Sequence, residues 1–170
     1  MTAIDEATLG EDGALIPLET ADDNRRAAAA LARQARYSIL LLSPDLEVGV
    51  FGDPAFVAGV SAVARHSARS HVHILARDSR QAVQRDHPLI RLAQDLSSHV
   101  KIHRIPEDIE DADYTVLVVD QKGYLYRRVS ERMDGVACFH NPPIAWQYVH
   151  AFQGIWEQSD EDISLRRLHL

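Results

Sequence analysis

The sequence predicts one α/β domain with a mixed, mostly parallel sheet flanked by helices. Three apolar runs, at residues 37–42, 71–76 and 114–119, have the composition of strands that are covered on both faces. Stretches with helical periodicity separate the first runs, and this alternation is typical of right-handed βαβ units. A chain of 170 residues is long enough for one ordinary domain with its own core.

Four stretches are expected to be helices, because each joins a start signal to an apolar face. The first is rich in alanine and follows an approximate capping signal between Thr20 and Asp23. In the others, proline stands at the first helical position. The predicted helices cover residues 20–36, 54–67, 88–96 and 142–158.

The remaining strands are predicted from alternation and turn chemistry. Residues 100–105 alternate between apolar and polar side chains. A turn at residues 121–123 leads from the apolar run into "YLYRRV", and residues 135–139 are a further strand candidate. The polar segments 43–53 and 77–87 are expected to be loops.

Charge divides the chain into two parts. Residues 1–23 contain seven acids and neither lysine nor arginine, so they account for the whole net charge of −7. We expect this segment to be an acidic, flexible tail, and residues 24–170 to be the single domain. The domain is formally neutral and lacks the basic excess of a nucleic-acid-binding protein, so nucleic acid is not favoured as a partner.

Composition excludes several other classes. No apolar run approaches the length of a membrane span, and the acidic start does not resemble a secretory signal. Cys138 is the only cysteine, which excludes an internal disulfide and a cysteine-rich zinc site. A reducing cytoplasm fits best. Neither a P-loop nor a G-x-G-x-x-G fingerprint is present, so no cofactor and no metal are expected.

Position in the predicted sheet selects candidate binding residues, because ligands of such sheets bind beyond the carboxyl ends of the strands. By this rule the candidates are Ser43, Asp45, Arg77, Asp78, Arg80 and Asp120. Arg127 and Arg128 join them if their strand ends at the same edge. His87 precedes a predicted helix within a basic loop, where it could contact an anion or lie on a solvated surface.

Three segments resemble successive strands of the phospholipase D-like fold. They read "ARYSILLLSPDLE", "ARSHVHILARDS" and "VLVVDQKGYLYRR", and the resemblance covers roughly residues 25–158. The family carries an HxKxxxxD motif in which His attacks phosphorus and Lys neutralises the phosphoryl oxygens. If Asp120 is the motif's Asp, Asp113 stands at the His position and Thr115 at the Lys position. The resemblance therefore implies a non-catalytic member.

A second fragment leaves an enzymatic alternative open. His71, His73 and Asp78 have the HxKxxxxD spacing, with His in place of Lys. They could form a variant phosphodiesterase motif, part of a metal site, or an ordinary polar strand face. Asp120, in turn, could be a turn residue rather than a site residue.

The favoured function is a non-enzymatic phospholipase D-like module that binds an anionic, phosphate-containing ligand or a protein partner. The expected ligand-binding residues are Arg77, Arg80, His87, Asp120, Arg127 and Arg128. The alternative is a phosphodiesterase that uses His71 or His73. Because single-motif members of the resembled family commonly pair through their sheets, a homodimer is also expected.

Overall fold

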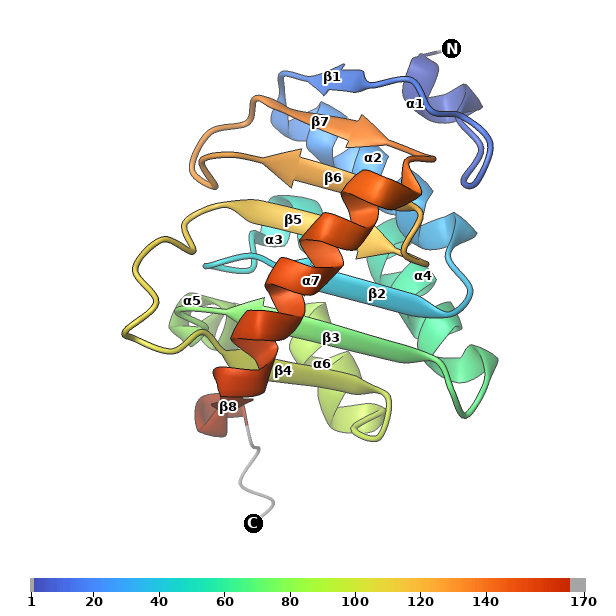
Figure 1. Ribbon diagram of the computed structural model, residues 1–170. Helices are drawn as coiled ribbons and strands as arrows, with labels where there is room; N and C mark the ends of the chain where they lie inside the picture. The colour runs from blue at the N-terminus through green and yellow to red at the C-terminus, as the bar shows by residue number, and fades with distance from the viewer. Residues whose placement is uncertain (1, 166–170) are drawn as a thin grey trace.

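The computed structural model describes residues 2–165, which form one sheet with the strand order β1-β7-β6-β5-β2-β3-β4-β8 (Figure 1). The strands are β1 (Ile16–Leu18), β2 (Ser38–Leu42), β3 (His71–Ala76), β4 (Val100–Arg104), β5 (Thr115–Val119), β6 (Gly123–Arg127), β7 (Gly135–Cys138) and β8 (Asp160–Glu161). The predicted α/β architecture, a mixed sheet flanked by helices, is confirmed. The last residues of the predicted domain, 166–170, lie outside the described residues.

Fewer strands pair in parallel than the sequence predicts. Only the β2–β3 and β3–β4 pairs are parallel within the described residues, and the other neighbouring strands are antiparallel. The reason lies in the connections, because helices link β2, β3 and β4, whereas a tight turn links β5 to β6. Asp120 and Gln121 form that turn, and their φ values of 50° and 57° are those of a type I′ hairpin turn.

Helices cover both faces of the sheet (Figure 1). The helices are α1 (Ala3–Glu6), α2 (Ala21–Gln34), α3 (Val48–Phe51), α4 (Pro54–His66), α5 (Arg80–Gln84), α6 (Pro88–Asp95) and α7 (Pro142–Gln158), followed by a 3₁₀ turn at Ile163–Leu165. α7 crosses one face, and α2, α4 and α6 lie on the other. The short helices α3 and α5 occupy the two segments that the sequence predicts as loops.

The central strand β2 shows why both faces are apolar. Ile39 and Leu41 belong to the core under α2 and α4, whereas Leu40 and Leu42 belong to the core under α7. Successive side chains of a strand point to opposite faces, so a strand between two layers needs apolar residues throughout. All five residues of β2 are buried.

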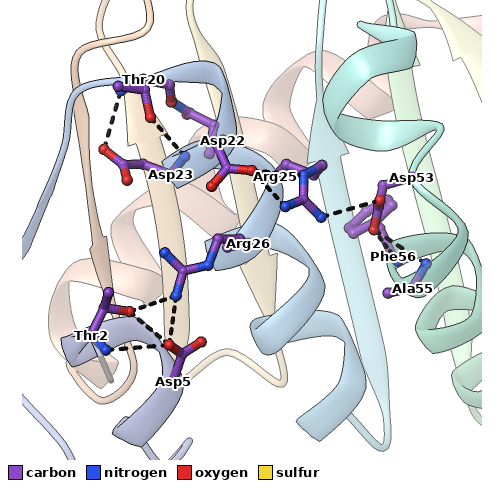
Figure 2. Close-up of polar contacts among 11 residues, drawn as sticks. Thr2, Asp5, Thr20, Asp22, Asp23, Arg25, Arg26, Asp53, Ala55 and Phe56 are labelled. Atoms are coloured by element: carbon purple, nitrogen blue, oxygen red, sulfur yellow. Dashed lines mark hydrogen bonds and ion pairs between the residues drawn. The ribbon is translucent and has the colours of Figure 1, made fainter.

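Acidic side chains anchor the first helices at their starts (Figure 2). Thr20 accepts a hydrogen bond from the Asp23 backbone N–H, and Asp23 bonds back to the Thr20 N–H, which completes a capping box. Asp53 caps α4 by accepting hydrogen bonds from the backbone N–H groups of Ala55 and Phe56. Arg25 bridges the two helix starts through ion pairs of 2.5 Å with Asp22 and 3.5 Å with Asp53.

The first segment of the chain differs from the flexible tail that the sequence predicts. β1 adds an antiparallel edge strand beside β7, and Ile4, Ile16 and Leu18 are buried in the core. Arg26 of α2 pairs with Asp5 at 2.5 Å (Figure 2). The segment is acidic overall, but it contains three apolar residues, Ile4, Ile16 and Leu18, that pack into the core and hold the segment on the domain. The predicted boundary after residue 23 also falls inside α2.

The ends of the strands form two opposite borders of the sheet, which we call the carboxyl edge and the amino edge. The carboxyl edge is the one where β2, β3 and β4 end; β5 begins and β6 ends there because they run antiparallel to β2 and β5 respectively. The amino edge is the opposite one, at the right of Figure 1. Helices α2 and α4 end at the amino edge, next to the starts of β2 and β3.

Candidate functional site

A hollow of about 600 Å³ opens at the carboxyl edge, beyond the ends of β3 and β4. Ligands of open α/β sheets bind in this position. The hollow is lined by Arg77, Asp78, Ser79, Arg80, Arg104, Glu107 and Asp162. It brings together three of the residues predicted from the sequence, and it is the candidate site.

Arginines and acids are paired around this hollow. Arg80 binds Asp78 at 2.9 Å, and Arg104 lies 3.5 Å from Glu107. Hydrogen bonding from Arg80 lowers the pKa of Asp78 to about 2, so Asp78 is ionised at neutral pH. The hollow therefore presents both hydrogen-bond donors and acceptors, with nearly balanced charge.

Arg77 is the most firmly placed of the three arginines. Its Nη2 donates a hydrogen bond of 2.7 Å to the carbonyl oxygen of Ile109, and its Nε lies 3.7 Å from an Asp113 carboxylate oxygen. That Nε is buried and has no hydrogen-bond partner. The nearest acceptor to this Nε is the Asp113 carboxylate, which lies at ion-pair distance.

The start of β5 holds the two residues that align with the catalytic motif. Asp113 is exposed and faces Arg77, and the side chain of Thr115 is fully buried. The hydroxyl groups of Thr115 and Ser43 are both buried without a hydrogen-bond partner. Neither Asp113 nor Thr115 lines the hollow. Thr115 is buried, and Asp113 is a carboxylate that faces Arg77.

Arg127 is not an exposed ligand-binding arginine, which corrects the sequence prediction. Its side chain is fully buried and binds Glu47, the Ser130 carbonyl oxygen and the Asn24 side chain. Burial raises the pKa of Glu47 despite the opposing effect of this arginine. A Cβ at Gly135 would lie 2.6 Å from Arg127 Cγ, so glycine makes room for the arginine. Arg127 therefore joins β6 to α2 and α3 from the inside.

Asp120 lies at the amino edge, away from the candidate site, and this also corrects the prediction. Because β5 is antiparallel to β2, its end lies beside the start of β2. The Asp120 carboxylate accepts hydrogen bonds from the backbone N–H groups of Arg36, Tyr37 and Ser38 at 2.9, 2.7 and 3.0 Å. Its role is to hold the chain that enters β2.

His87 is a buried helix cap rather than an exposed anion ligand. Its Nδ1 accepts a hydrogen bond from the Leu89 N–H at 3.1 Å, and its Nε2 lies 2.9 Å from the carbonyl oxygen of Leu46. Burial lowers the pKa of His87, so the imidazole is neutral at pH 7 and fixes the start of α6. The side chain has no access to an anion in solution, since its exposed fraction is 0%.

The variant motif is not assembled into one site. His71 and His73 lie on β3 under α7, and the His73 ring stacks on Trp156 with centroids 4.2 Å apart. Burial lowers the pKa of His73 to about 4. Asp78 follows the other end of the strand, roughly 16 Å from His73 along extended chain, so a joint reaction at one phosphorus has no geometric support.

Arg128 is exposed and does not line the hollow. Four of the lining residues, Ser79, Arg104, Glu107 and Asp162, are not among the candidates that the sequence predicts. Arg104 lies next to the end of the predicted strand 100–105, so the same positional rule could have found it. Asp162 reaches the hollow because β8 returns beside β4, a long-range pairing that a two-residue strand does not reveal in the sequence.

Residues 20–168 match the family described as Domain of unknown function (DUF7931). The chain belongs to this family. A comparison of the DUF7931 chain with curated proteins finds no match.

Solved structures place the DUF7931 domain in the phospholipase D-like fold. Nuc, a phospholipase D family member from Salmonella typhimurium, matches with a TM-score of 0.65 and 13% identity over 89% of this chain and 99% of that one. NucT from Helicobacter pylori matches with a TM-score of 0.56 and 12% identity over 88% of this chain and 98% of that one. The resemblance predicted from the sequence is thus confirmed for the fold.

A third similar structure is TrmBL2, an archaeal chromatin protein described as showing a novel mode of DNA binding. It matches with a TM-score of 0.65 and 12% identity, over 92% of the DUF7931 chain and 56% of the TrmBL2 chain. At such identities the likeness concerns the fold alone.

Two structural findings concern metals and membranes. In residues 2–165, no three or more His, Cys, Asp or Glu side chains are grouped so that they could hold a metal ion. In the same part of the chain, every helix is too short or too polar to cross a bilayer. The homodimer and the cytoplasmic location stay predictions.

Proposed function

We propose that this DUF7931 domain is a non-enzymatic binding module whose carboxyl-edge hollow takes a small phosphate-bearing ligand. The observation that carries the proposal is the hollow itself, where three arginines converge beyond the parallel strands. Guanidinium groups match the geometry of phosphate oxygens. Arg77 forms one hydrogen bond, to the Ile109 carbonyl oxygen, and its contact with Asp113 is only a long ion pair of 3.7 Å.

The ion pairs around the hollow do not block an incoming phosphate. Arg80 and Asp78 have side-chain exposures of 82% and 50%, and the Arg104–Glu107 pair is also exposed. Exposed pairs of this kind contribute about 0–1 kcal/mol, so a phosphate can exchange with the carboxylates. The displaced carboxylates then become acceptors for hydroxyl groups, which favours a phosphate ester of a polyol over inorganic phosphate.

The non-enzymatic part of the proposal follows from the motif positions. A carboxylate at Asp113 would repel a phosphodiester, and Thr115 offers no cation for the transition state. The residues that line the hollow in the described chain include no histidine. The phosphodiesterase alternative, with His71 or His73 as nucleophile, is less well supported because His73 stacks under α7 and Asp78 lies at the other end of β3.

Isothermal titration with glycerol 3-phosphate tests the proposal. We expect saturable binding by the native protein and at least a tenfold loss in Arg77→Gln, which removes the best-placed donor. Arg85→Gln is the matched control, because Arg85 is exposed and does not line the hollow. No binding by native protein, or equal binding by Arg77→Gln, contradicts the proposal.

Catalysis is tested separately with bis(p-nitrophenyl) phosphate. We expect no turnover, with or without divalent metal ions. Turnover that disappears in His73→Ala, but persists in a control such as His150→Ala, would establish the enzymatic alternative instead.

A further inference from the structure

The cations at the amino edge are not paired with acids. Arg33, Arg36, Arg69 and Lys122 form no ion pair within the described residues, and Arg65 bonds only to the Ser61 hydroxyl group there. These five residues are called the amino-edge cations below. Their charge is available to an external anion without displacing an internal partner.

The amino-edge cations come from neighbouring elements. Arg36 lies just before β2, Arg69 just before β3, and Lys122 in the turn between β5 and β6. β5, β2 and β3 are adjacent, and neighbouring strands lie about 4.8 Å apart. The cations at the strand ends therefore follow one another along the edge, which suits a ligand with repeated negative charges.

A hollow of about 450 Å³ lies between the ends of α2 and α4, and two of the amino-edge cations, Arg33 and Arg36, line it. Its lining contains no carboxylate and consists of Leu9, Arg33, Gln34, Ala35, Arg36, Ala62 and His66. The Gln34 amide is already used, since it accepts from the Leu9 N–H at 2.8 Å and donates to the Ala7 carbonyl oxygen at 3.1 Å. The guanidinium groups of Arg33 and Arg36 are thus the main free donors of this hollow.

The backbone that carries Arg36 is held in place before any ligand arrives. Asp120 accepts hydrogen bonds from the backbone N–H groups of Arg36, Tyr37 and Ser38. Its negative charge offsets part of the positive charge of the five amino-edge cations.

An exposed aromatic ring accompanies the cations. Tyr37 is 59% exposed, and its ring meets the His66 ring edge-on with centroids 5.8 Å apart. Proteins that bind single-stranded nucleic acid combine a basic track for the phosphates with aromatic rings on which bases stack. An anionic membrane would need a broader apolar surface than this single tyrosine.

Helix dipoles account for only part of this pattern. Basic residues in the last turn of a helix are stabilised by its negative end, which explains Arg33 in α2 and Arg65 in α4. Arg36, Arg69 and Lys122 lie outside any helix, so the dipoles do not explain them.

We infer that the amino edge binds single-stranded nucleic acid, with the amino-edge cations on successive phosphates and Tyr37 stacked on a base. This surface lies at the opposite ends of the strands from the carboxyl-edge hollow and shares no lining residue with it. The formal neutrality of residues 24–170 does not reveal this surface, because a net charge says nothing about which cations have acidic partners.

Fluorescence anisotropy with a labelled single-stranded oligonucleotide of about twelve nucleotides tests the inference. We expect a dissociation constant of about 1–100 μM near physiological salt, the range of electrostatic binding without sequence preference. Each phosphate contact contributes about −0.7 to the slope of log K against log salt. Four or five contacts therefore predict a slope of about −3.

Arg33→Glu/Arg36→Glu is expected to weaken binding at least tenfold and to make the salt slope smaller by more than about 1. Arg85→Glu/Arg91→Glu changes the net charge equally but away from the amino edge, so it is expected to bind within about threefold of native protein at 200 mM salt. Because all four side chains are exposed, circular dichroism should show native folding. Arg33→Gln/Arg36→Gln serves as a milder second variant.

Tyr37→Ala separates stacking from charge. It should weaken binding of the single strand several-fold while leaving the salt slope unchanged. The inference is overturned if native protein does not bind the oligonucleotide at low salt, or if both double variants lose the same affinity. It is also overturned if vesicles containing phosphatidylserine bind and the oligonucleotide does not.

Discussion

The arginines at the carboxyl edge are paired with acids, whereas those at the amino edge are not, in the part of the chain that the structure describes. At the carboxyl edge, Arg77, Arg80 and Arg104 each have an acid within ion-pair distance. At the amino edge, Arg33 and Arg36 have none within the described residues. The difference shows that the number of arginines at a surface does not determine which ligand it attracts. Paired arginines act locally on a small ligand, whereas unpaired arginines produce an electrostatic field that attracts a polyanion.

Helix direction contributes to this segregation. α2 and α4 begin near the carboxyl edge, where Asp23 and Asp53 cap them, and they end at the amino edge with Arg33 and Arg65 in the last turns. Acids near helix starts and bases near helix ends are both stabilising. Because α2 and α4 both run from the carboxyl edge to the amino edge, this preference places acids near the carboxyl edge and bases near the amino edge.

The largest expected effect comes from the most deeply paired arginine. Arg127→Met leaves Glu47 partly buried without its cation, and breaking a buried pair in this way costs about 3–5 kcal/mol. Chemical denaturation followed by tryptophan fluorescence measures the change. Arg128→Met, the exposed neighbour, should stay within about 0.5 kcal/mol of the native free energy of unfolding.

The double variant Arg127→Met/Glu47→Leu sharpens this result. Replacing both partners with apolar residues should recover much of the lost stability, because no unpaired charge remains. A loss below about 1 kcal/mol in Arg127→Met alone would show that the buried pair is not the link between β6 and α3.

A smaller loss is expected at the amino edge from Asp120→Ala. The carboxylate accepts three backbone hydrogen bonds, and its removal should lower the free energy of unfolding by about 2 kcal/mol. Asp120→Asn should lose less, because asparagine keeps one acceptor and tolerates the positive φ. Denaturation midpoints for the two variants are the measurement, and equal losses would contradict the proposed role of the carboxylate.

The smallest effect at neutral pH concerns neither edge but His73 under α7, whose contribution changes only on acidification. Its pKa is about 4 in the folded protein, below the ordinary histidine value of 6.5, so the unfolded state binds more protons between these values. The contribution of neutral His73 to the free energy of unfolding is therefore complete above about pH 6.5 and is lost as the pH falls toward 4. His71, Lys101 and His103 are the charged neighbours that add to this shift.

His73→Phe keeps an aromatic ring on Trp156 and removes the titrating group. The melting temperature of this variant should fall less between pH 7 and pH 5 than that of native protein. An identical fall in the two proteins would mean that other groups, such as His87 and His103, carry the pH dependence.

Sequence patterns predicted the strands well because apolar runs and turns are local signals. They did not predict strand direction, which depends on long-range pairing. Asp120 was therefore assigned to the wrong edge, since β5 pairs antiparallel with β2. Arg127 was assigned to the surface because nothing local indicates that Glu47, far away in the sequence, would neutralise it.

The candidate site was predicted in part for the same reason. Arg77, Asp78 and Arg80 follow a strand whose direction the βαβ pattern fixes, and they do meet at the carboxyl edge. The amino-edge cations could not be found in this way. They come from three separate segments, around residues 33–36, 65–69 and 122, and only the fold brings them to one edge.

The central claim is that the two edges bind different ligands independently. Two-dimensional ¹H–¹⁵N NMR tests it most directly, by titrating the same protein with glycerol 3-phosphate and then with the oligonucleotide. We predict that the first ligand shifts backbone amides near residues 77–80 and 104–107, and the second shifts those near residues 33–38, 66–70 and 121–123. Shifts of one common set of amides by both ligands would contradict the account.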